Sequence, residues 1–146
     1  MTKLFWIFLS AICITAYGHS QDKRFLENDF FRLSLDNQGK LTELLEKATG
    51  KNQLIQGYST SLLTVQSDGV NYPITSWERT GEILKFKFNE VGAEISVNIN
   101  SKSDYITFEI VKIKSEKFIE KVIWGPYHVL PSEKIGQSIG IAYDDN

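Results

Sequence analysis

The sequence predicts an all-β fold, an antiparallel β-sandwich, for the part of the chain that follows residue 18. Three observations predict it: apolar and polar residues alternate along most of this part, turn residues separate the alternating runs, and only one short segment has a helical period. A strand that is apolar on one face has to bury that face. Without helices the available cover is a second sheet, which gives a sandwich.

Residues 1–18 have the three-part pattern of a secretory signal peptide. Lys3 precedes the apolar run LFWIFLSAICI, and the small residues Ala16 and Gly18 stand before a polar stretch. This run of about eleven residues is shorter than the roughly twenty that a membrane-spanning helix needs. We therefore expect cleavage after Gly18, or alternatively after Ser20. The protein would then be exported, periplasmic or extracellular, without a transmembrane anchor.

The only cysteine, Cys13, lies inside the apolar run and raises the alternative of a lipid anchor. A lipoprotein site needs a small residue before the cysteine, whereas Ile12 is bulky, so we expect no lipid anchor. Without the leader no disulfide can form, and the fold depends on its core. Residues 19–146 have the size of one domain, and neither a repeat nor a linker divides them.

The charges argue against two classes of partner. The chain has 16 Lys and Arg against 18 Asp and Glu, a formal net charge of −2, and no block of one sign. Nucleic acids and anionic membrane surfaces are recognised through clustered Lys and Arg. We therefore expect no nucleic-acid partner.

The expected strands follow in chain order. Residues 31–35 alternate and end at the turn residues 37–39, which predicts a first strand. Residues 62–66 and 70–74 flank Asp68 and Gly69, a strong hairpin signal, and Pro73 places the second arm at an edge or a bulge. Three further alternating runs form an antiparallel meander, at residues 84–88, 93–99 and 106–110.

Two segments need a choice. Within residues 41–48, apolar residues at helical spacing suit a helix that Gly50 could end, but a strand turning at Thr49 and Gly50 fits the neighbouring hairpins equally well. The local pattern leaves both open. Residues 118–124 are apolar on both sides, with Phe118, Val122 and Trp124 on one side, which predicts a central strand.

No catalytic set stands out. Nucleophilic hydrolysis needs a base near the nucleophile, but His128 is the only histidine beyond the cleavage region and no G-x-S-x-G occurs. Metal sites need clustered ligands, and only the terminal triplet Asp144, Asp145 and Asn146 comes close to one; it is interpreted as a turn. We expect neither a cofactor nor a metal. Glu78, Glu109 and Glu120 are interpreted as solvated strand positions rather than an acid/base pair.

Four residues are candidates for contact with carbohydrate: Trp77, Trp124, Tyr127 and His128. Loops at the ends of a sandwich collect binding residues, and aromatic rings offer a flat apolar face to sugar C–H groups. Three of them have a structural alternative: Trp124 as a core side chain, His128 as a hydrogen-bonded loop residue, and Trp77 as part of the core edge.

The stretch FFRLSLDNQGKLTELLEKATGKNQLI, the meander and the string WGPY together resemble a known family. They are similar to the N-terminal, galactose-mutarotase-like β-sandwich (supersandwich) of secreted bacterial carbohydrate-active enzymes. The resemblance implies a module that packs against the catalytic domain of a glycoside hydrolase or polysaccharide lyase. It also implies a strand at residues 41–45.

Two departures from that family shape the expected function. Aldose epimerases of this type use histidines with a glutamate, so one histidine argues against mutarotation. The full supersandwich is longer, so we expect a partial one, with a catalytic domain or second chain covering an open edge. The leading hypothesis is a non-catalytic carbohydrate-associated module. The alternative is a stand-alone periplasmic or surface protein that binds a protein partner through an edge strand.

Overall fold

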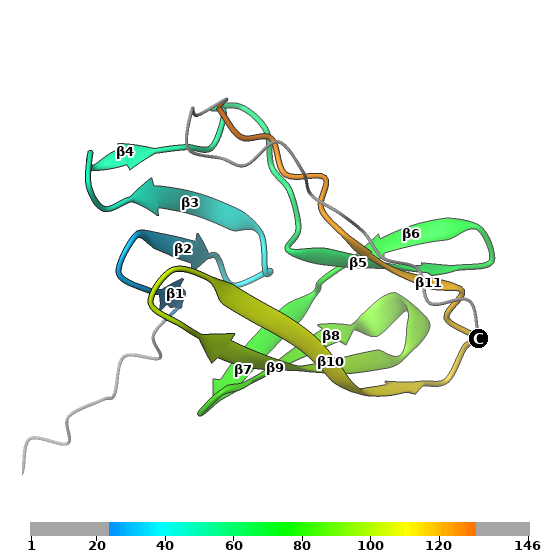
Figure 1. Cartoon of the computed structure of the whole chain (residues 1–146). Coiled ribbons are helices and arrows are strands. Elements are labelled where there is room, and N and C mark those ends of the chain that lie inside the picture. The colour runs from blue at the N-terminus through cyan, green and yellow to red at the C-terminus, as the bar shows by residue number, and fades with distance from the viewer. Residues whose placement is uncertain (1–23, 131–146) are drawn as a thin grey trace, which may run out of the picture.

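The computed structural model describes residues 24–130, which form eleven β-strands in three antiparallel sheets (Figure 1). Within these residues the helical content is one 3-10 turn, η1, at Asn89–Val91. The prediction of an all-β antiparallel protein is therefore confirmed. The predicted leader with Cys13 and the triplet 144–146 lie outside the described residues.

The first sheet contains β1 (Phe25–Glu27), β2 (Phe31–Leu35), β3 (Leu41–Glu46) and β4 (Lys51–Asn52), in chain order. The segment that the local pattern left open is therefore a strand. β3 pairs with β2 along its length, with Leu44 opposite Leu33. Pairing between strands therefore overrides the helical spacing of the apolar residues. The turn between them contains Gly39 at φ +68°, where a side chain would meet the buried Ile74.

The second sheet has the order β10-β9-β8-β7. Its strands are β7 (Ser76–Thr80), β8 (Ile83–Phe88), β9 (Ala93–Ser101) and β10 (Ile106–Ser115). The predicted meander is confirmed as β8, β9 and β10. Phe86 and Val97 are fully buried on its inner face, and Phe108 on β10 is half-buried against the same core.

The third sheet has the order β11-β5-β6, with β5 at Leu63–Ser67, β6 at Val70–Pro73 and β11 at Lys121–Trp124. Asp68 and Gly69 both have positive φ, at 51° and 72°, as a two-residue hairpin turn requires. The predicted hairpin is confirmed, and Pro73 lies on the edge strand β6. The carboxylate of Glu120 accepts a hydrogen bond of 3.1 Å from the Gly69 N–H.

The prediction of a central strand at residues 118–124 is wrong. The strand begins only at Lys121 and forms an edge of its sheet, and Phe118 is 82% exposed. The centre of this sheet is β5, which pairs with both β11 and β6. The apolar residues before Lys121 belong to the connection between β10 and β11. Apolar residues on both sides of this segment therefore did not indicate a strand that is buried on both faces.

All three sheets contribute to one apolar core. Leu26 and Leu35 come from the first sheet, Phe86 from the second and Val65 from the third, and all four are buried. Burial of each such large side chain contributes about 1.5–3 kcal/mol to the free energy of unfolding. In the second and third sheets β10 and β11 are edge strands, and Phe108 and Trp124 connect them with ring centroids 5.5 Å apart.

Candidate functional site

A small hollow lies where the segment after β11 meets the loop between β4 and β5. Three aromatic side chains and four others line it: Tyr58, Tyr127, His128, Leu41, Leu54, Ile55 and Thr60. The hollow is open to solvent, and the space of about 220 Å³ within it includes volume that belongs to the surrounding solvent. It is therefore a shallow, mostly apolar depression with an aromatic rim.

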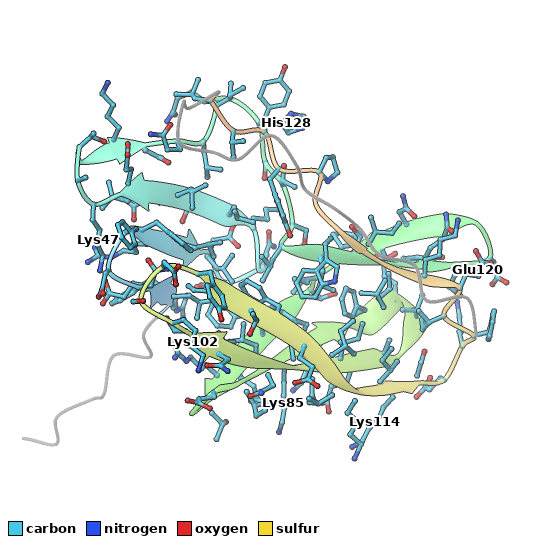
Figure 2. The ribbon with its side chains drawn as sticks, in the orientation of Figure 1. Lys47, Lys85, Lys102, Lys114, Glu120 and His128 are labelled. Atoms are coloured by element: carbon cyan, nitrogen blue, oxygen red, sulfur yellow. The ribbon has the colours of Figure 1, made fainter. Side chains whose placement is uncertain are left out.

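The rim is formed by the rings of Tyr58 and His128. Their centroids lie 4.2 Å apart with 24° between the ring planes, which is a stacked arrangement. Tyr58 is 60% exposed, and Figure 2 places His128 at the outer surface of the molecule. An exposed aromatic pair of this kind presents flat apolar area together with polar ring edges.

Backbone pairing holds His128 in place. The Ile55 N–H donates a hydrogen bond of 2.9 Å to the His128 carbonyl, and the Leu130 N–H donates one of 2.7 Å to the backbone carbonyl of Gln53. Leu54 and Val129 form an antiparallel bridge between the same two segments. The expectation of a hydrogen-bonded loop residue is confirmed for the His128 backbone, while its imidazole stays at the surface.

Tyr127 is fixed by its hydroxyl group. The hydroxyl donates a hydrogen bond of 2.5 Å to the backbone carbonyl of Leu62, which is itself buried. Burial raises the pKa of Tyr127 to about 12, against a smaller opposing effect of a hydrogen bond with the Gly125 backbone. The phenol therefore stays protonated at neutral pH, and Tyr127 also lines the hollow.

The other two sequence candidates lie elsewhere. The indole of Trp77 is half-buried, packs against the core, and donates a hydrogen bond of 2.6 Å from Nε1 to the Asp36 carbonyl. Trp124 is 37% exposed and contacts Phe108. Neither tryptophan lines the hollow. Of the alternatives, Trp77 lies at the core edge, and Trp124 is not a buried core residue.

Sequence reasoning missed Tyr58. Its segment, between β4 and β5, has no alternation and no motif, and Tyr58 precedes His128 by 70 residues. Gly57, at φ +88°, precedes Tyr58. A glycine indicates a turn, but it does not indicate which residue Tyr58 contacts. A non-periodic loop with an aromatic beside a glycine is a weak signal, and only the fold brings Tyr58 onto His128.

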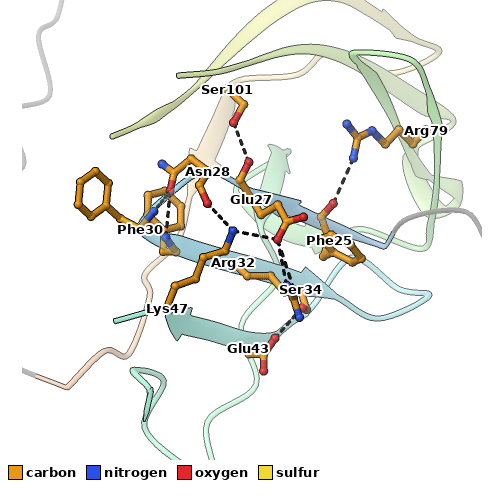
Figure 3. Close-up of polar contacts among 11 residues, drawn as sticks. Phe25, Glu27, Asn28, Phe30, Arg32, Ser34, Glu43, Lys47, Arg79 and Ser101 are labelled. Carbon is orange, nitrogen blue, oxygen red and sulfur yellow. Dashed lines mark hydrogen bonds and ion pairs between the residues drawn. The ribbon is translucent and has the colours of Figure 1, made fainter. Parts of the chain in front are cut away.

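A polar cluster, separate from the hollow, surrounds Glu27 at the β1–β2 hairpin (Figure 3). Two cations contact the same carboxylate oxygen of Glu27: Lys47 Nζ lies 3.1 Å from it and Arg32 Nη2 lies 3.3 Å from it. Lys47 also donates a hydrogen bond of 2.5 Å to the Asn28 carbonyl. The hydrogen bond from Lys47, followed by its charge and by Arg32, holds the pKa of Glu27 below its ordinary value. Because these cations are already paired, the cluster ties strands together rather than offering a ligand site.

Neighbouring bonds give this cluster the same structural role. Ser101 Oγ donates a hydrogen bond of 2.8 Å to the Glu27 carbonyl, and Arg79 Nη1 donates one of 3.1 Å to the Phe25 carbonyl. Side chains of the second sheet therefore cap the edge of β1. Among residues 24–130 no group of His, Cys, Asp and Glu is arranged to hold a metal ion. None of the helical segments in this range is long and apolar enough to cross a membrane.

Comparisons of the chain with protein-family models, with curated proteins and with solved structures give no match.

Proposed function

We propose that the chain is an exported, non-catalytic, carbohydrate-associated β-sandwich module of a bacterial glycoside hydrolase or lyase, of the galactose-mutarotase-like type. The observation that carries this proposal is the aromatic hollow with the stacked Tyr58 and His128 rings. The antiparallel all-β architecture is compatible with such a module. In this proposal the module supports a catalytic domain and contacts sugar through the hollow.

The chemistry of the hollow suits a sugar ring. Sugars combine apolar C–H faces with hydroxyl groups, and aromatic side chains combine an apolar face with a polar edge. Leu54 and Ile55 extend the apolar floor. Within the described part of the chain, no hydrogen bond occupies the Tyr58 hydroxyl or the Thr60 hydroxyl, so both can serve the hydroxyl groups of a ligand.

The size of the hollow limits the ligand. The hollow is open and encloses almost no space, unlike the clefts of about 300 Å³ or more that bury drug-sized molecules. We therefore expect it to take one sugar unit, such as a chain end, with weak affinity. Because no Lys, Arg, Asp or Glu lines it, binding of a neutral sugar should change little with salt.

The test is titration of the full chain with neutral oligosaccharides, after a glycan array has selected them. Tyr58→Ala and His128→Ala should each weaken binding by about tenfold, because each removes half of the stacked pair. Tyr105→Ala is the matched control, since Tyr105 is an exposed tyrosine that does not line the hollow. Absence of glycan binding, or binding unchanged by both hollow variants, contradicts the proposal.

Two further measurements address the rest of the proposal. N-terminal sequencing of the protein recovered outside the cytoplasm should begin at His19, or at Gln21 for the second cleavage site. A turnover assay on polysaccharides with the purified chain should show no cleavage. Hydrolysis that survives purification and depends on this chain would show that the module is itself an enzyme.

A second candidate function is a stand-alone periplasmic or surface protein that binds a protein partner. The observation that favours it is the long edge strand β10, with Val111 51% exposed and Ile113 47% exposed. Exposed edges recruit strands from other chains. A tight complex with another polypeptide and no glycan signal would select this function over the first.

A further inference from the structure

β10 forms one edge of its sheet. It is ten residues long, and within residues 24–130 only β9 pairs with it. An edge strand of this length presents a row of N–H and C=O groups that can pair with another strand. The composition and register of β10 determine which strand fits.

A β-bulge in β10 reverses its alternation. Before the bulge, Phe108 and Ile110 oppose Ile99 and Val97 of β9, which are buried on the inner face. The register then shifts between Ile110 and Lys112, and Val111 has no partner in β9. After the shift the residues that oppose the inner positions Ile95 and Ala93 are Ile113 and Ser115. Inner positions are therefore even-numbered before the bulge and odd-numbered after it.

This reversal makes β10 complementary to itself. If two copies pair antiparallel over the whole strand, Ile106 opposes Ser115, so the inner residues on either side of the bulge oppose each other, and at the centre Ile110 opposes Val111. In that register Phe108 faces Ile113, and Glu109 faces Lys112. Twofold symmetry makes each contact twice. A slip by one residue would oppose inner and outer side chains and would lose both matches.

The charges on the outer face fit the same register. Lysines on a free edge strand usually hinder pairing with another chain. Here Lys112 would meet Glu109 of the second copy, and Lys114 would meet the neutral Thr107, so no like charges lie opposite each other. The half-exposed Val111 and Ile113 would be covered at the same time.

We infer that β10 is a self-association edge, along which a second copy of this chain pairs antiparallel about a twofold axis at the step from Ile110 to Val111. The pairing joins the two four-stranded sheets into one continuous sheet. This inference is independent of the sugar-binding proposal, because no residue of β10 lines the aromatic hollow.

Charge reversal tests the register. In sedimentation equilibrium at low salt, the full chain should be a dimer, and Glu109→Lys and Lys112→Glu should each weaken the dimer by about tenfold or more, since each places like charges opposite each other twice. Mixing the two variants should restore dimers, because both contacts then join opposite charges. Lys85→Glu on β8 is the control and should leave the dimer unchanged.

Hydrogen exchange provides a readout that needs no variant. Amide groups of β10 should become more protected as the wild-type concentration rises, while those of the edge strand β6 should not. Circular dichroism checks that the reversed variants keep their strands. A monomer at all concentrations, a dimer that neither reversal weakens, variants that do not recover on mixing, or an edge that pairs only with a different polypeptide would overturn the inference.

Discussion

The indole of Trp77 on β7 donates a hydrogen bond of 2.6 Å to the backbone carbonyl of Asp36, in the turn between β2 and β3. The bond joins the second sheet to the first, and the Trp77 ring also lies 6.4 Å, centroid to centroid, from the buried Phe86. Trp77 is therefore part of the packing between sheets rather than a free platform for a ligand.

Trp77→Phe should lower the free energy of unfolding by about 1–2 kcal/mol, because it removes the hydrogen bond to Asp36 and some buried ring area. Chemical denaturation measures this change. Trp124→Phe is the control, since it keeps a ring beside Phe108 and breaks no described hydrogen bond. Loss of glycan binding in Trp77→Phe without loss of stability would contradict the structural role.

Gly39→Ala should be much more destabilising than Gly81→Ala. Both glycines have positive φ, at 68° and 61°, and share a backbone cost of about 1–2 kcal/mol for a residue with a side chain. A methyl group at Gly39 would also lie 2.7 Å from Ile74 Cδ1, whereas at Gly81 it would meet nothing within 4 Å. Overpacking should add about 1–3 kcal/mol at Gly39. Equal losses in thermal denaturation would refute the close approach to Ile74.

Acid should weaken the Glu27 cluster. Because the pKa of Glu27 is lowered in the folded protein, the folded state binds fewer protons than the unfolded one. The contribution of Glu27 is then present above its ordinary pKa of 4.5 and is lost as the pH falls through the lowered value. In an NMR titration, Lys47→Met should move the pKa of Glu27 back upward. Lys85→Met removes a lysine elsewhere and should leave that pKa unchanged.

Alkali should weaken the contact of Tyr127 with Leu62. The folded state holds the phenol proton up to a pKa of about 12, whereas the unfolded chain releases it near 10. The raised pKa therefore stabilises the fold below pH 10, and this contribution is lost as the pH rises through about 12. Tyr127→Phe should flatten this part of the stability profile, measured by denaturation at a series of pH values. Tyr105→Phe, which alters an exposed tyrosine, should not.

The candidate site was only half accessible to sequence reasoning. Tyr127 and His128 drew attention because they follow a strand and a Gly-Pro step. Their partner Tyr58 comes from a loop without a period, and nothing local connects it to residue 128. The two tryptophans were chosen for their chemistry, but the sheets place one against the core edge and the other against Phe108.

The sequence by itself determined the strands of the hairpin and the meander, because alternation and turn residues are local properties that act within a few residues. The tertiary structure decided that residues 41–46 pair as a strand, that Lys121–Trp124 lies at an edge, and that Tyr58 stacks on His128. Each of these depends on contacts between distant segments, whose free energy comes from pairing and burial that no local pattern contains.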